Sequence, residues 1–476
     1  MKPVAIVGGG ITGLTAAYRL TQKNIPVTVY ESASRVGGVI ATNHSGGFVA
    51  EAGPNTLLET SPKITSLIQD LRLESRRIYS SPIANKRYVV RGRKPVPLPG
   101  SPVGFFTTPL FSLVAKLRLF GEPFIRRSSQ PQEESLAQFV RRRIGREFLD
   151  YAINPFVGGV YAGDPEKLSV KHAFPKLHAL EQRYRSLILG QFLGARERRR
   201  RKEVSKQSAK QLSFDEGLHV LPDALQTEMG DRVQLDSAVL EMERRSDGWN
   251  VKVRRGDRET VCGHSAVLFT GPTHQLANLR IADPEQVQVD SFEEIHYPPV
   301  ASVALGFKRS DVDHPLDGFG MLIPEVERFH ILGSLFSSSI FPNRAPDGHV
   351  LLTCFIGGAR APQFALLDAE EMDRLILEDL GVLLGVHGKP VYRHCAVYQK
   401  AIPQYEVGYG RFKDKMSELE QRMAGLFLAG NFRNGIALGD SVVAGHDVAG
   451  RMEAFLSGGK SPQAPKPSTD ESSVAA

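Results

Sequence analysis

The sequence predicts an α/β fold that opens with a strand–helix–strand unit. Residues 4–7 and 27–31 are β-branched apolar runs typical of buried strands, and residues 14–20 between them favour a helix. Three glycines in the intervening turn keep the spacing G-x-G-x-x-G, and they are Gly8, Gly10 and Gly13. This spacing permits a tight turn, close approach of a pyrophosphate to the backbone, and close packing of the helix on the strand. The unit therefore predicts a parallel sheet with a dinucleotide site at its edge.

A carboxylate and a second glycine loop extend the predicted site. Glu31 ends the second strand, where its oxygens can accept hydrogen bonds from both ribose hydroxyls of a dinucleotide. The next loop holds Arg35 and the pair Gly37-Gly38, a combination that suits a loop folding over the pyrophosphate. A short strand at 47–51 is then expected to end in the tight turn 53–55. From these residues alone, NAD and FAD both remain open.

Composition indicates an ordinary globular protein. The chain has 476 residues, enough for two or three domains, with 41% hydrophobic and 23% charged residues. Its three cysteines lie far apart without metal-ligand or redox spacing, so we expect free thiols in a reducing cytosol and no metal site. Neither an export signal nor an apolar run of ~18–20 residues is present, which predicts a cytoplasmic protein. No nucleic-acid module accompanies the arginines, so we expect no nucleic acid as a partner.

Two kinds of segment suggest contact with a membrane. The excess positive charge behind the net charge of +7 is concentrated at 141–146 and 196–202. The simplest interpretation is that these arginines lie on solvated surface loops, and the more specific one is that they attract anionic lipid or an acidic ligand. Residues 104–124 form an apolar, aromatic stripe at helical spacing, with Lys116 and Arg118 inside it. Such a stripe most often marks a buried helix face, and a helix lying on a membrane surface is the alternative.

The remaining patterns predict a second domain around a mixed sheet. Four runs of strand length are apolar or alternate between apolar and polar residues, at 299–307, 320–324, 331–336 and 350–355. Together they could form a mixed sheet at the base of a large ligand pocket. The other expected elements are helices at 134–151, 171–193, 221–228, 370–384 and 441–456, a compact glycine loop at 155–165, a mobile basic loop at 196–210, a hairpin of strands 233–240 and 249–254, and strands at 266–270 and 426–431. The polar residues 457–476 predict a disordered tail.

Four features together resemble flavoproteins of the amine-oxidase and protoporphyrinogen-oxidase superfamily. They are the glycine fingerprint G-x-G-x-x-G at residues 8–13, Glu31, the Arg35 loop and the turn at 51–54. Five further motifs resemble the protoporphyrinogen oxidase family in particular, and they lie at 85–88, 159–163, 332–338, 353–358 and 401–405. The similarity runs from residue 4 to about residue 456. It implies a Rossmann-type FAD-binding domain, a mixed-sheet substrate domain and a mainly helical insertion that lies against a membrane.

The resemblance also implies domain boundaries. The expected FAD-binding domain comprises residues 1–84, 210–276 and 410–456. The substrate-binding domain would comprise 85–91 and 277–409, and the membrane-facing insertion 92–209. The domain at the N-terminus would therefore be completed by residues near the C-terminus.

The implied cofactor is FAD, lying along the fingerprint. The hairpin would bring the backbone of Val239 to the adenine, and the C-terminal strand and helix would meet the isoalloxazine and ribityl chain. The predicted FAD-binding residues are Gly8, Gly10, Ile11, Thr12, Gly13, Glu31, Ser32, Arg35, Gly38, Gly53, Pro54, Asn55, Thr56, Val239, Gly430, Ile436 and Ala437.

The implied reaction is the FAD-dependent oxidation of a porphyrinogen to a porphyrin in heme biosynthesis, with oxygen as acceptor. A porphyrinogen is large and apolar and carries anionic propionates, so it needs an apolar slot with a well-placed guanidinium. By resemblance Arg87 supplies the guanidinium, and Gly159, Leu322, Leu335 and Phe355 line the slot. No residue need act as a general base, because the flavin performs the difficult step. Other implied partners are a membrane surface at its inner face, a ferrochelatase that receives the product, and a second copy in a homodimer.

Several alternatives stay open. Arg87 does not distinguish protoporphyrinogen IX from coproporphyrinogen III, which carries four propionates. An amine or carotenoid oxidoreductase on the same fold is the enzymatic rival, and Tyr405 could contribute to the aromatic cage of an amine oxidase. A binding module that escorts lipidated ligands is the non-enzymatic rival, although it would be expected to have a degraded fingerprint. Tyr398, where the family often has tryptophan, and Asn431, where many members have an acid, depart from the family pattern.

Overall fold

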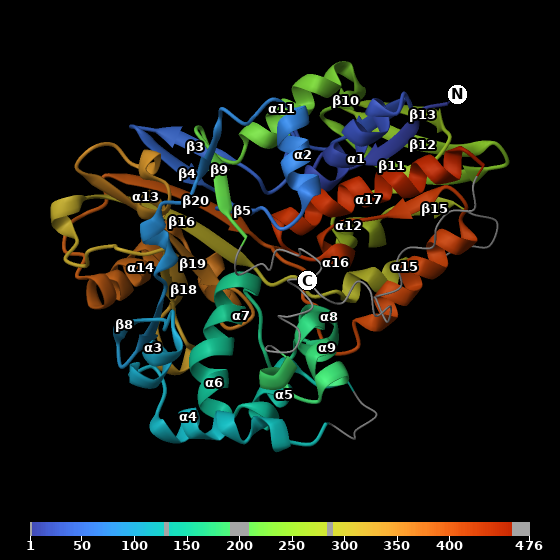
Figure 1. Cartoon of the computed structure of the whole chain (residues 1–476). Coiled ribbons are helices and arrows are strands. Elements are labelled where there is room, and N and C mark those ends of the chain that lie inside the picture. The colour runs from blue at the N-terminus through green and yellow to red at the C-terminus, as the bar shows by residue number, and fades with distance from the viewer. Residues whose placement is uncertain (1, 128–132, 191–208, 283–288, 459–476) are drawn as a thin grey trace.

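Two large sheets organise the chain, as the computed structural model shows (Figure 1). It describes residues 2–127, 133–190, 209–282 and 289–458. One sheet is parallel, with strand order β10-β2-β1-β14-β21, and the other has seven strands in the order β20-β16-β19-β18-β17-β7-β8. The predicted α/β class with a mixed-sheet second domain and a helical insertion is confirmed.

The parallel sheet forms because apolar strands from distant parts of the chain bury both faces. Its strands are β1 (Val4–Val7), β2 (Val27–Tyr30), β10 (Val233–Gln234), β14 (Val267–Phe269) and β21 (Leu426–Leu428). The covering helices include α1 (Ile11–Gln22), α2 (Pro62–Asp70), α11 (Val220–Met229) and α17 (Leu438–Leu456). Because β21 and α17 come from the end of the chain, the first domain is closed by the last elements.

A four-stranded sheet of order β13-β12-β11-β15 packs beside the parallel sheet. It consists of β11 (Ser237–Arg245), β12 (Gly248–Arg255), β13 (Arg258–His264) and β15 (Arg280–Ala282). The predicted hairpin is present, but its first strand is Ser237–Arg245 instead of 233–240, because residues 233–234 pair with β2 as β10 of the parallel sheet. The sequence missed β13, because most of its side chains are polar and exposed and the apolar signal of a strand is weak.

The seven-stranded sheet has one closed and one partly open face. Its strands are β7 (Tyr88–Arg91), β8 (Lys94–Pro97), β16 (Val300–Lys308), β17 (Gly320–Leu322), β18 (Ile331–Leu335), β19 (His349–Gly357) and β20 (Tyr392–Tyr398). Helix α14 (Ala369–Leu384) covers one face and forms a core with Val303, Leu352 and Ile356. The opposite face looks towards the first domain and the insertion (Figure 1).

Smaller elements join the two domains. The pair β3 (Thr42–Ser45) and β4 (Phe48–Glu51) touches the large sheet, where the Phe48 ring stacks on Tyr392 with centroids 4.7 Å apart. A three-stranded sheet contains β5 (Leu57–Leu58), β6 (Arg77–Tyr79) and β9 (Gln211–Phe214). These contacts fix the orientation of the two domains with respect to each other.

The insertion is helical, with α3 (Pro102–Thr107), α4 (Leu113–Phe120), α5 (Leu136–Arg143), α6 (Arg146–Phe148), α7 (Asn154–Tyr161), α8 (Val170–Ala173) and α9 (Pro175–Tyr184). The prediction of a glycine loop over the whole of 155–165 is wrong, because α7 continues to Tyr161. Pro155 is tolerated in the first turn of a helix. Gly159 permits close packing, since a Cβ there would lie 2.3 Å from the Leu322 Cδ2 atom.

The apolar stripe at 104–124 is not a buried helix face. Leu110 and Phe111 are buried, but the side chains that α4 and the turn after it present are open to solvent. Leu113 is 69% exposed, Leu117 58% and Phe124 87%. Lys116 instead lies inside, where its Nζ atom donates to the carbonyls of Phe106 and Thr108. Helix α4 therefore has apolar side chains outside and a lysine inside, and it lies at the end of the molecule opposite α1 and β13 (Figure 1).

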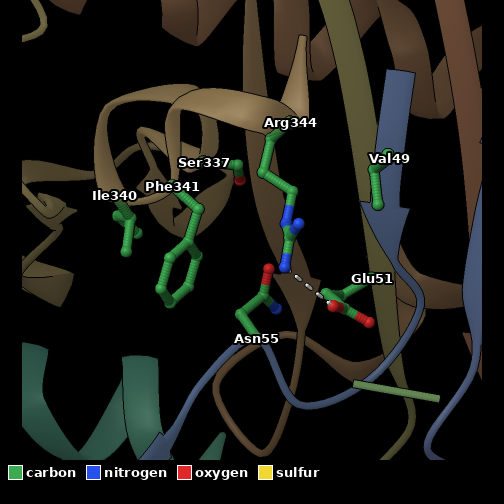
Figure 2. Close-up of a pocket in the computed structure, with 7 residues that line it drawn as sticks. All are labelled: Val49, Glu51, Asn55, Ser337, Ile340, Phe341 and Arg344. Atoms are coloured by element: carbon green, nitrogen blue, oxygen red, sulfur yellow. Dashed lines mark ion pairs between the residues drawn. The ribbon is translucent and has the colours of Figure 1, made fainter. Parts of the chain in front are cut away.

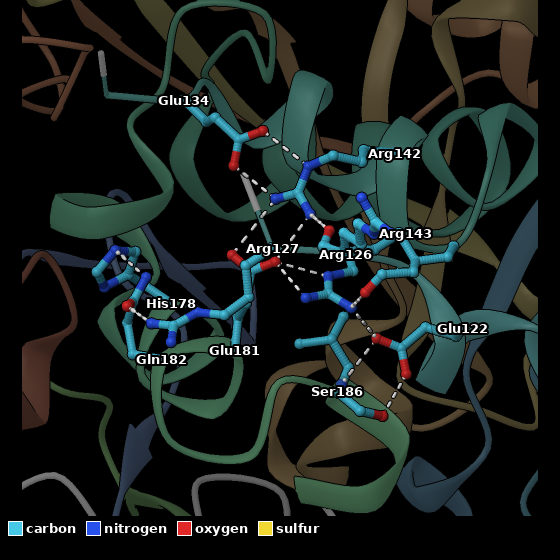
Figure 3. Close-up of polar contacts among 12 residues, drawn as sticks. Glu122, Arg126, Arg127, Glu134, Arg142, Arg143, His178, Glu181, Gln182 and Ser186 are labelled. Atoms are coloured by element: carbon cyan, nitrogen blue, oxygen red, sulfur yellow. Dashed lines mark hydrogen bonds and ion pairs between the residues drawn. The ribbon is translucent and has the colours of Figure 1, made fainter. Parts of the chain in front are cut away.

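Arg142 and Arg143 are held in ion pairs within the insertion (Figure 3). Arg141 pairs with Glu166 but remains about half exposed. Arg143 is fully buried, and its guanidinium donates to Glu181 at 2.7 Å and to Glu122 at 3.1 Å. Glu122, also fully buried, accepts from Ser186 and from the Leu187 N–H group. These charges tie the turn after α4 to α5 and α9, so Arg142 and Arg143 are not free to bind lipid.

Other expectations fall outside the described residues. The basic run at 196–202, most of the predicted mobile loop and the tail from residue 459 all lie there. The predicted helix at 171–193 is divided between α8 and α9, with Phe174 and Pro175 at the break. Across the described ranges, no helix is both long and apolar enough to cross a membrane.

We predict that Arg143→Ala lowers the stability of the insertion strongly. The substitution leaves Glu122 buried without its guanidinium partner and leaves Glu181 with Arg142 alone, which costs ~3–5 kcal/mol. Arg141→Ala is the matched control, because the Arg141–Glu166 pair is about half exposed and is expected to contribute less than ~1 kcal/mol. Thermal unfolding and limited proteolysis of the insertion measure both effects, and equal losses would contradict the prediction.

Candidate functional site

The glycine fingerprint forms an open cradle at the start of α1. Gly10 precedes the helix and no side chain caps it, so the first N–H groups point outward unsatisfied. A Cβ atom at Gly13 would lie 2.1 Å from the Gly8 carbonyl oxygen, whereas a Cβ atom at Gly10 would meet no atom within 4 Å. Gly13 is therefore required for packing, and the space beside Gly10 is free for a phosphate group.

Glu31 lies at the end of β2 and faces the same cradle. Its two carboxylate oxygens accept from the N–H groups of Gly9 at 2.7 Å and Ala33 at 2.8 Å. These bonds fix the carboxylate and leave lone pairs for ribose hydroxyls. Ser32 beside it is exposed and its hydroxyl donates to Glu31 at 3.3 Å.

The Arg35 loop folds onto the fingerprint, and its guanidinium also binds carbonyls of its own loop. The Gly37 N–H group donates to the Gly9 carbonyl at 2.9 Å and joins the two loops. The guanidinium of Arg35 donates to the carbonyls of Val36, Gly38 and Ile40. Arg35 therefore shapes the loop that carries Gly38, rather than offering all its donors to a ligand.

The turn after β4 approaches the same loop. A Cβ atom at Gly53 would lie 2.3 Å from the Val39 carbonyl oxygen, so only glycine allows this approach. The Asn55 amide donates to the Gly53 carbonyl at 3.0 Å and closes the turn. Pro54, Asn55 and Thr56 are all partly exposed beside the cradle.

The C-terminal elements meet the fingerprint from the other side. A Cβ atom at Gly430 would lie 3.5 Å from the Thr270 carbonyl, and the Thr270 hydroxyl lies 3.1 Å from the Gly8 carbonyl. The Thr12 hydroxyl donates to the Ser441 carbonyl, joining α1 to the first turn of α17. Ala437 precedes α17 without a side-chain cap, so a second set of N–H groups is free.

The other residues predicted to contact FAD lie at the starts of α1 and α17 and on β11. Ile436 and Ala437 are partly exposed next to Gly435, and Ile11 and Thr12 are buried at the start of α1. Val239 lies at an irregularity of β11, where the pairing with β12 shifts by one residue. A bulge of this kind releases backbone groups from the ladder, which suits a contact with a ligand.

The predicted substrate residues form one strip across the open face of the large sheet. Leu322 lies opposite Gly333, and Gly333 lies opposite Phe355 on the next strand. Leu335 is two residues from Gly333 and therefore points to the same face. Leu322, Leu335 and Phe355 are all partly exposed, and Gly159 of α7 covers Leu322. Tertiary structure thus brings four predicted residues together.

Two arginines lie at opposite ends of β17. Arg87 is exposed, stacks over the Phe319 ring at 5.4 Å, and forms no ion pair among the described residues. Arg360, which the sequence did not single out, donates to the Ile323 carbonyl at 3.0 Å and to the Asn154 side-chain oxygen at 3.0 Å. Burial lowers the pKa of Arg360, and no carboxylate of a described residue lies within ion-pair distance of it.

A small cavity lies beside the turn at Asn55 (Figure 2). Glu51, Asn55 and Ser337 line it with Arg344, whose guanidinium lies 3.7 Å from the Glu51 carboxylate. Burial raises the pKa of Glu51 to about 7, although Thr42, Leu218 and Arg344 stabilise its charged form. None of the strip residues lines this cavity. Nothing in the sequence around Arg344 marked this buried pair.

The geometry weakens the amine-oxidase alternative. Tyr405 is 4% exposed, and its ring packs on Tyr409 with centroids 4.5 Å apart, so it does not present a face to a cage. Tyr398 lies between β20 and the cofactor loops, with its hydroxyl 3.5 Å from the Val39 carbonyl. Within the described ranges, no group of three metal-ligating side chains occurs.

Comparison with known proteins agrees with this arrangement. The profile of flavin-containing amine oxidoreductases matches residues 11–452. Protoporphyrinogen oxidase 2 of Arabidopsis thaliana, a chloroplastic and mitochondrial protein, is 35% identical over 96% of this chain and 94% of its own length. The coproporphyrinogen III oxidase of Bacillus subtilis (strain 168) is 29% identical over 96% of this chain and 98% of its own length. A crystal structure from Exiguobacterium sp. 255-15 has the same fold, with a TM-score of 0.79 at 23% identity over 96% of this chain and 99% of that chain.

The chain therefore belongs to the family of flavin-containing amine oxidoreductases. Within that family the predicted resemblance to the protoporphyrinogen oxidases is confirmed. FAD, one of the two cofactors that the fingerprint left open, is the cofactor of this family. The cradle fits it, since the space at Gly10, the carboxylate of Glu31 and the free helix N-termini match a pyrophosphate with a ribose on one side.

We predict that Gly13→Ala abolishes FAD binding, because the new methyl group would displace the turn at Gly8. Gly450→Ala is the matched control, since it lies on the exposed side of α17 where a Cβ atom meets nothing within 4 Å. The control should retain FAD and gain up to ~1 kcal/mol of stability from better helix propensity. The ratio of flavin absorbance to protein absorbance measures binding, and a yellow Gly13→Ala protein would refute the prediction.

Proposed function

We propose that the protein oxidises protoporphyrinogen IX to protoporphyrin IX, with FAD as cofactor and oxygen as acceptor. The observation that carries this proposal is the half-buried apolar strip of Leu322, Leu335 and Phe355, with Arg87 at one end. The 35% identity to a protoporphyrinogen oxidase supports it over nearly the whole chain. The substrate combines a broad apolar body with carboxylates, and the strip combines an apolar floor with one guanidinium.

The residues of the site hold and orient the substrate. The strip and Gly159 enclose the macrocycle and exclude water, and Arg87 binds a propionate and thereby sets which methylene bridge faces the cofactor. FAD held by the cradle would supply the oxidising power as an acceptor of hydride from the substrate. Three such steps with proton loss remove six hydrogens, and with oxygen as acceptor three molecules of hydrogen peroxide form.

The decisive experiment follows porphyrin fluorescence in air, with purified yellow protein and correction for spontaneous oxidation. Protoporphyrinogen IX should be oxidised, and Arg87→Met should lower kcat/KM by ~10–100-fold, the value of a charged hydrogen bond to the propionate. If the flavin is bound and neither protoporphyrinogen IX nor coproporphyrinogen III is oxidised, the proposal fails and amines become the substrates to test.

Arg360 favours coproporphyrinogen III as the second candidate. It lies at the other end of β17 from Arg87 and forms no ion pair among the described residues. A substrate with propionates on all four rings would place a carboxylate near each arginine. In the same assay, Arg360→Met should then lower kcat/KM for coproporphyrinogen III at least ~10-fold and for protoporphyrinogen IX by less than ~3-fold. Arg309→Met is the control, because Arg309 likewise binds two carbonyls but lies outside the strip.

We also propose that the insertion attaches the protein peripherally to the cytoplasmic face of a membrane. The exposed apolar side chains of α4 support this, because a surface with Leu113, Leu117, Phe120 and Phe124 in water is unfavourable. An interfacial helix would bury these side chains while remaining too short to span the bilayer.

Flotation with vesicles that contain anionic lipid tests the attachment. The wild-type protein should float, and the double variant Leu117→Glu/Phe120→Glu should lose at least ~10-fold in binding, since each side chain contributes ~1.5 kcal/mol or more when buried. Val261→Glu is the control, because Val261 is similarly exposed but lies on β13. Recovery of the wild type in the soluble fraction at low salt would contradict the proposal.

A further inference from the structure

One buried tyrosine connects the two halves of the candidate site. The hydroxyl of Tyr405 donates to the carbonyl of Asn431 and accepts from the N–H group of Gly435, 3.1 Å away. Both partners belong to the segment between β21 and α17. Tyr405 itself belongs to the segment that follows β20 of the large sheet. A single hydroxyl therefore bridges the two ends of a turn in the other domain.

The turn that Tyr405 bridges has an irregular backbone. It contains the single-turn helix α16 (Asn431–Asn434), with Gly430 before it at φ 144° and Gly435 after it at φ 116°. Residues other than glycine rarely adopt these angles, and no long hydrogen-bond ladder holds the turn. Bonds within the turn join Gly430 to Asn434, and the hydroxyl of Tyr405 adds a link from Asn431 to Gly435 that comes from the other domain.

The segment 401–405 also touches the substrate strip. Ala401 and Ile402 pack against the same buried cluster as Phe355 of the strip, a cluster that contains Leu332. The Gln404 amide donates to the Tyr161 carbonyl at the end of α7. Five consecutive residues thus contact the strip at one end and the turn before α17 at the other. Beyond that turn lie Ile436 and Ala437, the predicted flavin contacts.

We propose that Tyr405 is a positioning residue for the reaction. Its hydroxyl holds the turn at 431–435, and with it the free N–H groups at the start of α17, at a fixed place relative to the strip. This sets where the flavin lies with respect to the substrate and which N–H groups meet its ring. The inference rests on the proposed function for its catalytic consequence, but not for its effect on the flavin.

Tyr409 provides an internal control of the same kind. Its hydroxyl donates to the Phe432 carbonyl of the same turn at 2.7 Å, and its ring is equally buried. It makes no bond to Gly435 among the described contacts, so it does not bridge the turn. Both Tyr→Phe substitutions remove one buried hydroxyl and leave the packing of the two rings unchanged.

The test compares Tyr405→Phe with Tyr409→Phe. We expect Tyr405→Phe to raise the dissociation constant for FAD by ~10-fold, to shift the flavin absorption maxima and midpoint potential, and to lower kcat more than it raises KM. Tyr409→Phe should change these quantities by less than ~2-fold, although its unfolding temperature falls to a similar extent.

The inference is overturned if Tyr405→Phe keeps the wild-type FAD affinity, spectrum and potential, or if the two variants change them equally. Either result would make Tyr405 an ordinary structural contact. Because the affinity, spectrum and potential are measured without a porphyrinogen, this outcome is distinct from failure of the proposed function, which concerns turnover by the wild type.

Discussion

The close approach of three backbone segments at the fingerprint is the constraint on which the rest of the structure depends. Gly13 lies so near the Gly8 carbonyl that a methyl group has no room, and a Cβ atom at Gly445 of α17 would lie 2.5 Å from the Thr12 carbonyl. The start of the chain and its last helix must therefore be folded together. The cradle exists only in the complete first domain, and the remaining elements are placed around it.

The two faces of the seven-stranded sheet in the second domain are covered to different extents. One face is sealed by α14, which supplies the stability that a sheet needs. The other face leaves Leu322 and Phe355 partly open, an arrangement that costs hydrophobic stabilisation unless a ligand covers them. The buried pair Glu51–Arg344 and the hydroxyl of Tyr405 then hold this face against the cofactor loops. Polar groups and the stacked rings of Phe48 and Tyr392 join the domains, and apolar groups form the slot.

The insertion reverses the usual distribution of side chains. Arg143 and Glu122 are fully buried, whereas Leu113 and Phe124 lie in solvent. Buried charges are tolerated only when they are paired and hydrogen-bonded, and the cluster around Glu181 meets that condition. The cluster fixes the turn after α4, and a small apolar cluster with Ala115 and Leu119 holds the helix itself. The exposed side chains of Leu113 and Phe124 are therefore available for contact with another apolar environment, such as a membrane.

Sequence alone determined the local features of this protein. The fingerprint, the strands of the parallel sheet and helix α14 followed from glycine spacing and hydrophobic period, because these depend on neighbours within a few residues. It did not determine the burial of the stripe at 104–124, since periodicity shows that a helix has an apolar face but not what covers it. Arg360, Arg344 and the bridging role of Tyr405 also came only from tertiary structure. Their partners are far away in the chain, and only folding brings a guanidinium to Glu51 or a hydroxyl to the turn at Asn431.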